Sequence, residues 1–418
     1  MKTIEQMIRQ AEKELREAFD RIDENESLRT RQVLDAFRQE SVSYRHFSPT
    51  TGYGYDDIGR DTLERIYASV FHTEAALMRP HVACGTAALS LTLFGLTRPG
   101  EQIVSATGMP YDTLQGVIGI GGEMKPGSLK EMGVGFKHVE LKDGQIDVCS
   151  VEKAITERTT LVIAQRSRGY AWRPSLFPSA FEELAEMIHT RHPGVTLMVD
   201  NCYGEFVCAD EPTDHGADLV VGSLIKNPGG GIAPAGGYVA GRKEQIERIA
   251  GRLTAPGLGR EIGSYEASYR PFYQGLFMAP HTVAQALKTA LLAARLFENL
   301  GIETTPPSTE RRADIIQAIK MRSAERLVAF CQGIQTASPV DSMAMPEPWD
   351  MPGYDDQVVM AAGTFVAGAS IELSADGPIR PPYTAYMQGG LTYIHGRITL
   401  AEALKRMIET GALNPPES

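Results

Sequence analysis

The sequence contains little cysteine for its length. Five cysteines are spread over 418 residues, their number is odd, and no two have CxxC spacing. This pattern argues against a disulfide framework and predicts free thiols in a reducing cytoplasm. The histidines show no HxH or HExxH spacing either, so we expect no metal site.

Long apolar runs are also missing. No run reaches the roughly 18 residues that a membrane-spanning helix needs, so we expect no membrane partner. The charged start MKTIEQMIRQAEKELREAFDRIDENE is helical in pattern and does not resemble a signal peptide. The formal net charge of −11 argues against nucleic acid or an anionic membrane surface as the main partner. It still permits a small anionic ligand, because a local pocket can be basic.

The pattern of apolar residues divides the chain into three parts. Residues 1–50 predict an N-terminal helical arm, because apolar side chains recur at helical spacing from Ile4 to Phe19. Between about 80 and 245, apolar strands alternate with helices, which is typical of a mostly parallel sheet covered on both faces. A long helix near 280–300 leads into a smaller region of strands and helices. We therefore expect an α/β fold with a large domain at 51–290 and a small α+β domain at 291–418.

Seven apolar segments are expected to form the large sheet. Ligands bind at the carboxyl ends of the strands in such sheets, so the residues that end each strand matter most. The expected strands are ALMRPHV, QIVSAT, GFKHVEL, TTLVIAQRS, TLMVDNC, LVVGSL and GGYVAG.

Two of these strands end near charged residues. Asp200 ends one strand, and Lys226 closely follows another. Alone, the aspartate fits a turn cap and the lysine a surface charge, but neighbouring parallel strands would aim both into one cleft. A desolvated lysine has a lowered pKa and can attack a carbonyl, and the NPGGG segment after it lets the backbone approach a bound group. A carboxylate there can keep a ring nitrogen protonated, as pyridoxal phosphate requires.

Other segments supply candidates for a phosphate and a ring. Gly85 and Thr86 begin a helix directly after a strand, where backbone N–H groups and the helix dipole attract phosphate, and Ser223 could add a hydroxyl. Tyr111 begins another helix and could cover a planar ring. Taken alone, Gly85 and Thr86 fit an ordinary helix cap, and Tyr111 fits a core or surface tyrosine better than a ring cover.

The order of these segments resembles a known family. GYGYDDIGRD, CGTAAL, GMPYDTLQ, QRSRGY, VDNCYGEF, SLIKNPGGG, APAGGYVAGR and PPYTAYMQGGLTY span roughly residues 50–395. Together they resemble the methionine gamma-lyase-like, or aluminium resistance, branch of the pyridoxal-phosphate enzymes of Cys/Met metabolism. The resemblance implies a fold-type-I transferase-like large domain, pyridoxal 5'-phosphate as cofactor and an amino acid as substrate. It also implies carbon–sulfur lyase activity by β- or γ-elimination, of the methionine gamma-lyase or cystathionine lyase type.

The resemblance further implies individual roles. Lys226 would form the internal aldimine and shuttle protons, Asp200 would hold the ring nitrogen, and Tyr111 would stack on the ring and serve as acid or base. The implied phosphate-binding positions are Gly85, Thr86 and Ser223. Two subunits build each site in that superfamily, so a homodimer or homotetramer is expected. Tyr55 and Arg60, with Tyr53 nearby, lie in the stretch that reaches the neighbouring subunit.

The sequence also departs from the better-known lyases. Ile225 replaces a hydroxyl residue just before the lysine, which removes one phosphate donor. QRSRGYAWRPS replaces the segment near the ring hydroxyl, where Arg166, Arg168 or Tyr170 could act instead. For the substrate carboxylate we choose Arg380 and Arg168, with Arg397 as the rival of Arg380.

Three alternatives stay open at this point. Another pyridoxal-phosphate reaction, by a transferase, racemase or decarboxylase, would use the same residues. A dinucleotide-dependent oxidoreductase would need GxGxxG after the first strand, which CGTAAL does not provide. A non-catalytic protein of the same fold would lack the lysine or carry a DNA-binding module, and the acidic N-terminal helix is poorly suited to DNA.

Overall fold

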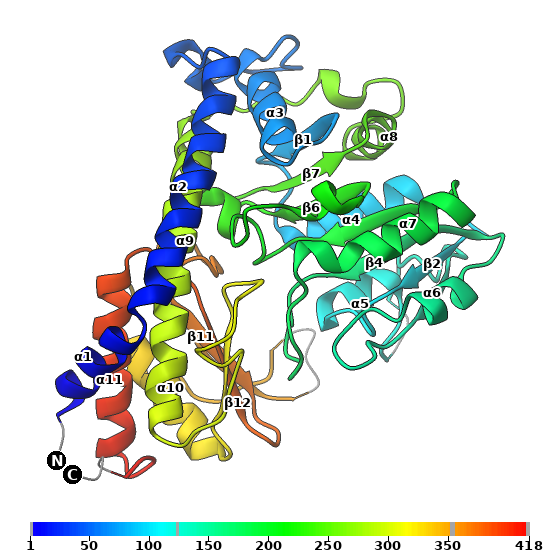
Figure 1. Ribbon diagram of the computed structural model, residues 1–418. Helices are drawn as coiled ribbons and strands as arrows, with labels where there is room; N and C mark the ends of the chain where they lie inside the picture. Colours follow the sequence, from blue (N-terminus) through cyan, green and yellow to red (C-terminus); the bar gives the residue numbers. More distant parts are fainter. Residues whose placement is uncertain (1–2, 123–124, 352–355, 415–418) are drawn as a thin grey trace.

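The protein is described by a computed structural model that covers residues 3–122, 125–351 and 356–414. Its N-terminal arm consists of α1 (Ile4–Glu14) and α2 (Arg16–Gln39). The helical arm expected at residues 1–50 therefore consists of two helices that meet at Leu15, and the second one ends at Gln39. A reciprocal capping box between Thr3 and Gln6 fixes the start of α1. Figure 1 shows α2 running alongside α9 on one side of the molecule.

The large sheet has the seven strands that the sequence predicts. Their order is β1-β7-β6-β5-β4-β2-β3, and β7 runs in the direction opposite to the other six strands. The strands are β1 (Ala75–Arg79), β2 (Gln102–Ser105), β3 (Gly135–His138), β4 (Thr159–Gln165), β5 (Thr196–Asp200), β6 (Leu219–Ser223) and β7 (Gly237–Gly241).

Side chains from the strands alternate between two apolar cores, so both faces of the sheet are covered. Val162 and Val199 belong to one core, whereas Leu161 and Met198 belong to the other. The helices are α3 (Ile58–Val70), α4 (Gly85–Leu96), α5 (Asp112–Ile118), α6 (Val148–Ala154), α7 (Glu182–Arg191) and α8 (Lys243–Leu253). Short 3-10 turns lie at η1 (Tyr44–Phe47), η2 (Pro178–Phe181), η3 (Pro212–His215), η4 (Asn227–Gly229) and η5 (Gly259–Glu261).

A second, antiparallel sheet forms the small domain. Its order is β10-β11-β12-β9-β8. The strands are β8 (Thr304–Thr305), β9 (Gln317–Lys320), β10 (Val358–Ala361), β11 (Ser374–Pro378) and β12 (Thr384–Gln388). One face packs against α10 (Ala324–Thr336) and α11 (Tyr393–Glu409) in a third apolar core. The α/β architecture with a separate small sheet domain confirms the expected fold.

The helix α9 (Arg270–Asn299) connects the two domains without a break. It begins ten residues before the expected start at 280. Leu276 and Leu287 lie in the large-domain core, whereas Leu292 and Phe297 lie in the small-domain core. The helix therefore passes from the large-domain core into the small-domain core between Leu287 and Leu292. The domain boundary expected at residue 290 stays a prediction.

Membrane-spanning helices and metal-binding clusters are both absent from the described residues. None of the helices in the described ranges is long and apolar enough to cross a membrane. Within the same ranges, no three His, Cys, Asp or Glu side chains are arranged to hold a metal ion.

Candidate active site

A cavity of ≈ 580 Å³ lies between the two domains. One wall contains the residues at the carboxyl ends of the parallel strands: Gln165 of β4, Asp200 of β5 and Lys226 beyond β6. The opposite wall contains the small-domain residues Ser374 and Asp376 of β11. The strand-end rule for α/β sheets therefore describes this site.

Lys226 and Asp200 line the same cavity, as the strand-end pattern predicts. The Lys226 Nζ lies 4.1 Å from the centre of the Tyr203 ring. Burial lowers the pKa of this amine, but the acidic groups around it, led by Cys202 and Tyr203, raise the pKa well above its usual range. The lowered lysine pKa expected from desolvation is therefore wrong for this chain: the acidic neighbours, Asp200 among them, outweigh burial.

Asp200 is almost fully buried, and its Oδ1 accepts a hydrogen bond from the Cys202 backbone N–H at 3.1 Å. Burial raises the pKa of this carboxyl, and the Lys226 charge opposes the shift. A buried carboxylate that retains a nearby cation can hold another positive group, such as a protonated ring nitrogen. Burial also raises the pKa of the Cys202 thiol, which makes it a poor nucleophile.

Tyr111 connects the cavity to the start of α4. Its hydroxyl lies 3.1 Å from the Thr86 Oγ1, which in turn lies 3.2 Å from the Thr113 Oγ1. Burial raises the pKa of Tyr111, with Asp200 acting in the same direction, so the hydroxyl keeps its proton. The structure therefore brings the expected ring and phosphate residues next to each other.

The N-terminus of α4 has the form of an anion cradle. Its N-cap residue, Cys84, makes no side-chain capping hydrogen bond. A Cβ added at Gly85 would lie 3.2 Å from the Ser223 Cβ and 3.4 Å from the Cys202 Sγ, so a side chain at this position would crowd the cradle. Backbone N–H groups, the Thr86 and Ser223 hydroxyls and the helix dipole together suit a phosphate. With Asp200, Tyr111 and Lys226 beside it, this donor set fits pyridoxal phosphate.

The glycines after Lys226 have a different role from the one expected. A Cβ at Gly230 would lie 2.4 Å from the Gly275 carbonyl oxygen of α9, and a Cβ at Gly231 would lie 2.2 Å from Leu391. Both residues also have positive φ angles. The close approach that these glycines permit is therefore to α9 and Leu391, so the lysine segment rests directly on the long helix.

The candidate arginines separate into two groups. Arg168 and Arg380 line the cavity, as does Tyr170. Arg168 is buried and donates to the Thr305 carbonyl oxygen at 2.8 Å, whereas Arg380 is half-exposed and pairs with Asp356 at 2.8 Å. The rival Arg397 lies outside the cavity, because it pairs with Glu12 and Glu5 of α1. Arg168 and Arg380 therefore remain candidates for binding the substrate carboxylate, whereas Arg397 is no longer one.

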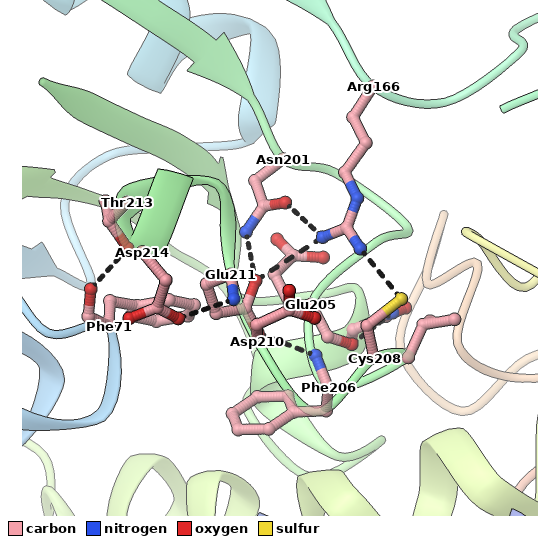
Figure 2. A network of polar contacts seen from close by, with 12 residues as sticks. Phe71, Arg166, Asn201, Glu205, Phe206, Cys208, Asp210, Glu211, Thr213 and Asp214 are labelled. Carbon is pink, nitrogen blue, oxygen red and sulfur yellow. Dashed lines mark hydrogen bonds and ion pairs between the residues drawn. The ribbon is translucent and has the colours of Figure 1, made fainter. Parts of the chain in front are cut away.

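Arg166 lies behind the cavity in a buried polar network, which Figure 2 shows. Its Nη1 donates to the Asn201 Oδ1 at 2.7 Å and pairs with the Glu211 Oε2 at 3.4 Å. Arg29 of α2 pairs with the same Glu211 carboxylate. The network joins α2 to the ends of β4 and β5, so Arg166 supports the wall that carries Asp200 and does not line the cavity.

Tyr55 and Arg60 do not line the cavity of their own chain. Tyr55 is 58% exposed and stacks on Tyr53 with the ring centres 5.4 Å apart. Arg60 is buried, donates to the Gly54 carbonyl oxygen at 2.9 Å and pairs with Asp61 at 2.7 Å. Any contribution of this stretch to an active site would have to be made in another subunit.

Sequence reasoning missed most of the small-domain wall and Tyr203. The small-domain residues come from short antiparallel strands whose alternation is interrupted by glycine and proline, and no motif marks them. The two-residue alternation SADGP and TAYMQ was the available signal. The residues concerned are Ser374, Asp376, Tyr386 and Gln388.

Comparisons with known proteins agree with this geometry. The Bacillus subtilis protein YnbB is 50% identical over 378 residues, which cover 90% of each chain. The structure of a Clostridium novyi carbon–sulfur lyase involved in aluminium resistance is 48% identical, with a TM-score of 0.93, covering 97% of this chain and 96% of that one. A proposed cystathionine beta-lyase of Listeria monocytogenes, also involved in aluminium resistance, is 47% identical, with a TM-score of 0.94, covering 96% of this chain and 99% of that one.

The family model described as methionine gamma-lyase matches residues 4–408. The resemblance read from the sequence segments is thereby confirmed. The match includes both domains and every residue of the cavity described above. The chain therefore belongs to the methionine gamma-lyase family of pyridoxal-phosphate-dependent lyases.

Proposed function

We propose that this protein binds pyridoxal phosphate and cleaves a carbon–sulfur bond of an amino acid by β- or γ-elimination. The observation that carries the proposal is the shared position of Lys226 and Asp200 at the ends of β6 and β5, in one cavity beside the α4 cradle. One water molecule would be consumed when the enamine product hydrolyses, and the products would be a thiol, a 2-oxo acid and ammonia. The family match supports the class of reaction, and the names of the solved relatives support sulfur as the leaving atom.

Five residues would hold the cofactor in this proposal. Asp200 would pair with the ring nitrogen and Tyr111 would cover the ring. When bound, the cofactor supplies an electron sink for the carbanion at the substrate Cα. The residues proposed for its phosphate are Gly85, Thr86 and Ser223.

Proton transfer falls to Lys226 in the proposal. Lys226, with its amine neutral, would accept the proton that leaves the substrate Cα and return it to a later carbon. Tyr111, whose hydroxyl stays protonated, would donate to the departing sulfur. Arg168 and Arg380 would orient the substrate carboxylate from the rim of the cavity.

The first experiment is a visible spectrum of the purified protein with added pyridoxal phosphate, before and after borohydride. We expect an absorbance band that borohydride removes. Lys226→Ala should lack the band and release no 2-oxo acid from sulfur amino acids, whereas Lys405→Ala, a change on the exposed face of α11, should behave as wild type. A protein that takes up no cofactor, or a Lys226→Ala variant with full activity, would refute the proposal.

We propose further that two subunits share each site. Tyr53 and Tyr55 present exposed, stacked rings away from their own cavity, and exposed aromatic surface commonly marks an interface. Mixing Tyr55→Ala with Lys226→Ala subunits should restore activity, because a hybrid dimer contains one site with both residues. Sedimentation that shows only monomers, or no recovery after subunit exchange, would contradict a shared site.

A further inference from the structure

Tyr203 lies in a tight turn shortly after β5. The Gly204 backbone N–H donates to the Asn201 carbonyl oxygen at 2.9 Å, so Tyr203 is the third residue of a four-residue turn. Its φ of 72° lies in the left-handed region, which glycine adopts at this position without strain. A tyrosine in this conformation strains the backbone, and such strain is concentrated at functional sites in proteins. The turn therefore points to a role for the Tyr203 side chain.

The contacts of Tyr203 hold its ring beside Lys226. The Tyr203 carbonyl oxygen accepts a hydrogen bond from the Ile315 backbone N–H at 3.2 Å. The side chain packs against a small apolar cluster that includes Ile316 and Tyr386. The ring lines the cavity, and the Lys226 Nζ lies 4.1 Å from its centre. This distance is within the range of a cation–π contact, in which the negative face of an aromatic ring attracts a positive charge.

The proton transfer proposed above places a positive charge on this nitrogen. The Nζ lone pair forms a new N–H bond, the substrate Cα–H bond breaks, and the electron pair of that bond stays on carbon for the cofactor to take up. Within the described residues, no carboxylate forms an ion pair with the Lys226 amine, so Asp200 acts on it from beyond ion-pair distance. The face of the Tyr203 ring is thus in direct contact with the nitrogen that becomes charged.

We propose that the Tyr203 ring stabilises the positive charge that develops on Lys226 while this lysine removes the α-proton of the substrate. The inference rests on the proposed function, because it concerns the same proton transfer. The turn and the apolar cluster fix the ring in advance, and its attraction for Nζ grows as the charge appears. Tyr203 is then a catalytic residue through its ring, and its hydroxyl group is not required.

A series of rings of nearly equal shape tests this role on the holoenzyme. Phenylalanine and its mono-, di- and trifluorinated forms are placed at position 203, since each fluorine weakens the negative face of the ring. The probe is L-alanine, which has an α-proton but no leaving group, and its exchange in deuterium oxide is followed by NMR. Tyr203→Phe should exchange within about twofold of wild type, and the rate should fall in steps to about tenfold lower with three fluorines.

A second readout uses the full-length chain without added cofactor. Acetic anhydride acetylates only neutral amines, and mass spectrometry compares Lys226 with the exposed Lys405 in the same sample. Because the ring favours the charged amine, acetylation of Lys226 near pH 8 should rise by up to about tenfold along the same series. The two rates should therefore change in opposite directions. A ring that only fills space would leave both unchanged, because its shape is retained.

The matched control is the same series at Phe94, whose ring faces Arg252 at 5.5 Å outside the cavity. Both readouts should stay at their wild-type values there. If neither rate varies along the series at position 203 while sulfur amino acids are cleaved, the role of Tyr203 is wrong and the proposed function stands. If alanine exchange follows the series but no sulfur amino acid is cleaved, the proposed function fails and the role of Tyr203 stands. A holoenzyme that catalyses neither reaction would overturn both.

Discussion

The two walls of the cavity differ in whether their buried carboxylates have positively charged partners. On the large-domain wall, Asp200 has Lys226 near it, and the Glu211 carboxylate behind it is paired with two arginines. On the small-domain wall, Asp376 has no ion-pair partner among the described residues. Paired buried charges hold a structure in one arrangement, whereas an unpaired one costs stability unless a ligand completes it. The two walls therefore differ in the electrostatic balance of their buried carboxylates: the carboxylates of the large-domain wall lie near cations, and Asp376 of the small-domain wall does not pair with one among the described residues.

The largest expected effect is a loss of stability when the buried ion pairs behind the large-domain wall are broken. Glu211→Gln leaves the buried Arg29 and Arg166 guanidinium groups without their shared carboxylate. Loss of one partner of a buried ion pair costs roughly 3–5 kcal/mol, so the melting temperature should fall sharply. Glu152→Gln, which removes an exposed pair with Arg191, should cost less than about 1 kcal/mol. Equal melting temperatures for both variants would mean that the network does not hold this wall.

The next effect concerns catalysis. Asp200→Asn removes the negative charge proposed for the ring nitrogen, and kcat/KM should fall by about 10²–10³-fold, as for other preorganised electrostatic groups. Asp218→Asn changes an equally buried aspartate that precedes β6, at the other end of the sheet, and pairs with Arg242 and His189. This control should affect the melting temperature but not kcat/KM. A fall of less than about tenfold in Asp200→Asn would remove Asp200 from its proposed role.

On the small-domain wall, removal of the buried charge should increase the stability of the protein instead of lowering it. Burial raises the pKa of Asp376 to about 6, and Tyr170 and Gln388 oppose the shift. The folded protein then keeps a proton that the unfolded chain loses at lower pH, so this group makes stability fall as pH rises from about 4 to about 6. The neighbouring Cys331 and Tyr386 have raised pKa values and do not titrate in this range.

Asp376→Asn abolishes this titration. Relative to wild type, the variant should be of similar stability near pH 4 and more stable by about 1–3 kcal/mol above pH 6. Thermal unfolding at both pH values measures the difference. Asp356→Asn, at the exposed rim, should show little change. A loss of stability in Asp376→Asn above pH 6 would mean that a cation already pairs with this carboxylate, and the contrast between the walls would disappear.

The smallest effect is expected at the α4 cradle. Gly85→Ala would place a methyl group 3.2 Å from the Ser223 Cβ, so the phosphate should bind about tenfold less tightly. Gly251→Ala in α8 is the matched control, because its Cβ would meet Pro256 at an ordinary 3.8 Å. Equilibrium titration with pyridoxal phosphate distinguishes the two. Unchanged affinity in Gly85→Ala would place the phosphate elsewhere.

Much of the first wall could be read from the sequence. Strand periodicity located all seven strands of the large sheet, and the rule that strand ends meet brought Asp200 and Lys226 together. These features depend on local pattern and on one general rule of topology. The sequence also allowed the selection of Tyr111, Gly85 and Thr86, because each of them lies where a helix begins after a strand.

The remaining features depend on long-range packing, which local pattern does not encode. Arg166 and Arg168 are two residues apart, yet one is buried behind the sheet and the other lines the cavity. The burial of Arg60 follows from contacts with Gly54 and Glu261, the latter about 200 residues away in the chain. The role of the NPGGG glycines depends on α9, a helix from a later part of the chain that packs directly against Gly230. The helix α8 was overlooked, although its apolar spacing is helical.

The uninterrupted helix α9 has a mechanical consequence. Near Gly275 it supports the segment that follows Lys226, and near Phe297 it is part of the core beneath the small-domain sheet. The two walls are therefore joined by one continuous helix (Figure 1), and direct contacts such as that of Arg168 with the Thr305 carbonyl oxygen also connect the two domains. Pro280, which lacks a backbone N–H, is the natural point of weakness along α9. A bend of α9 at Pro280 would accordingly change the distance between Lys226 and the small-domain wall only if these contacts between the domains also changed.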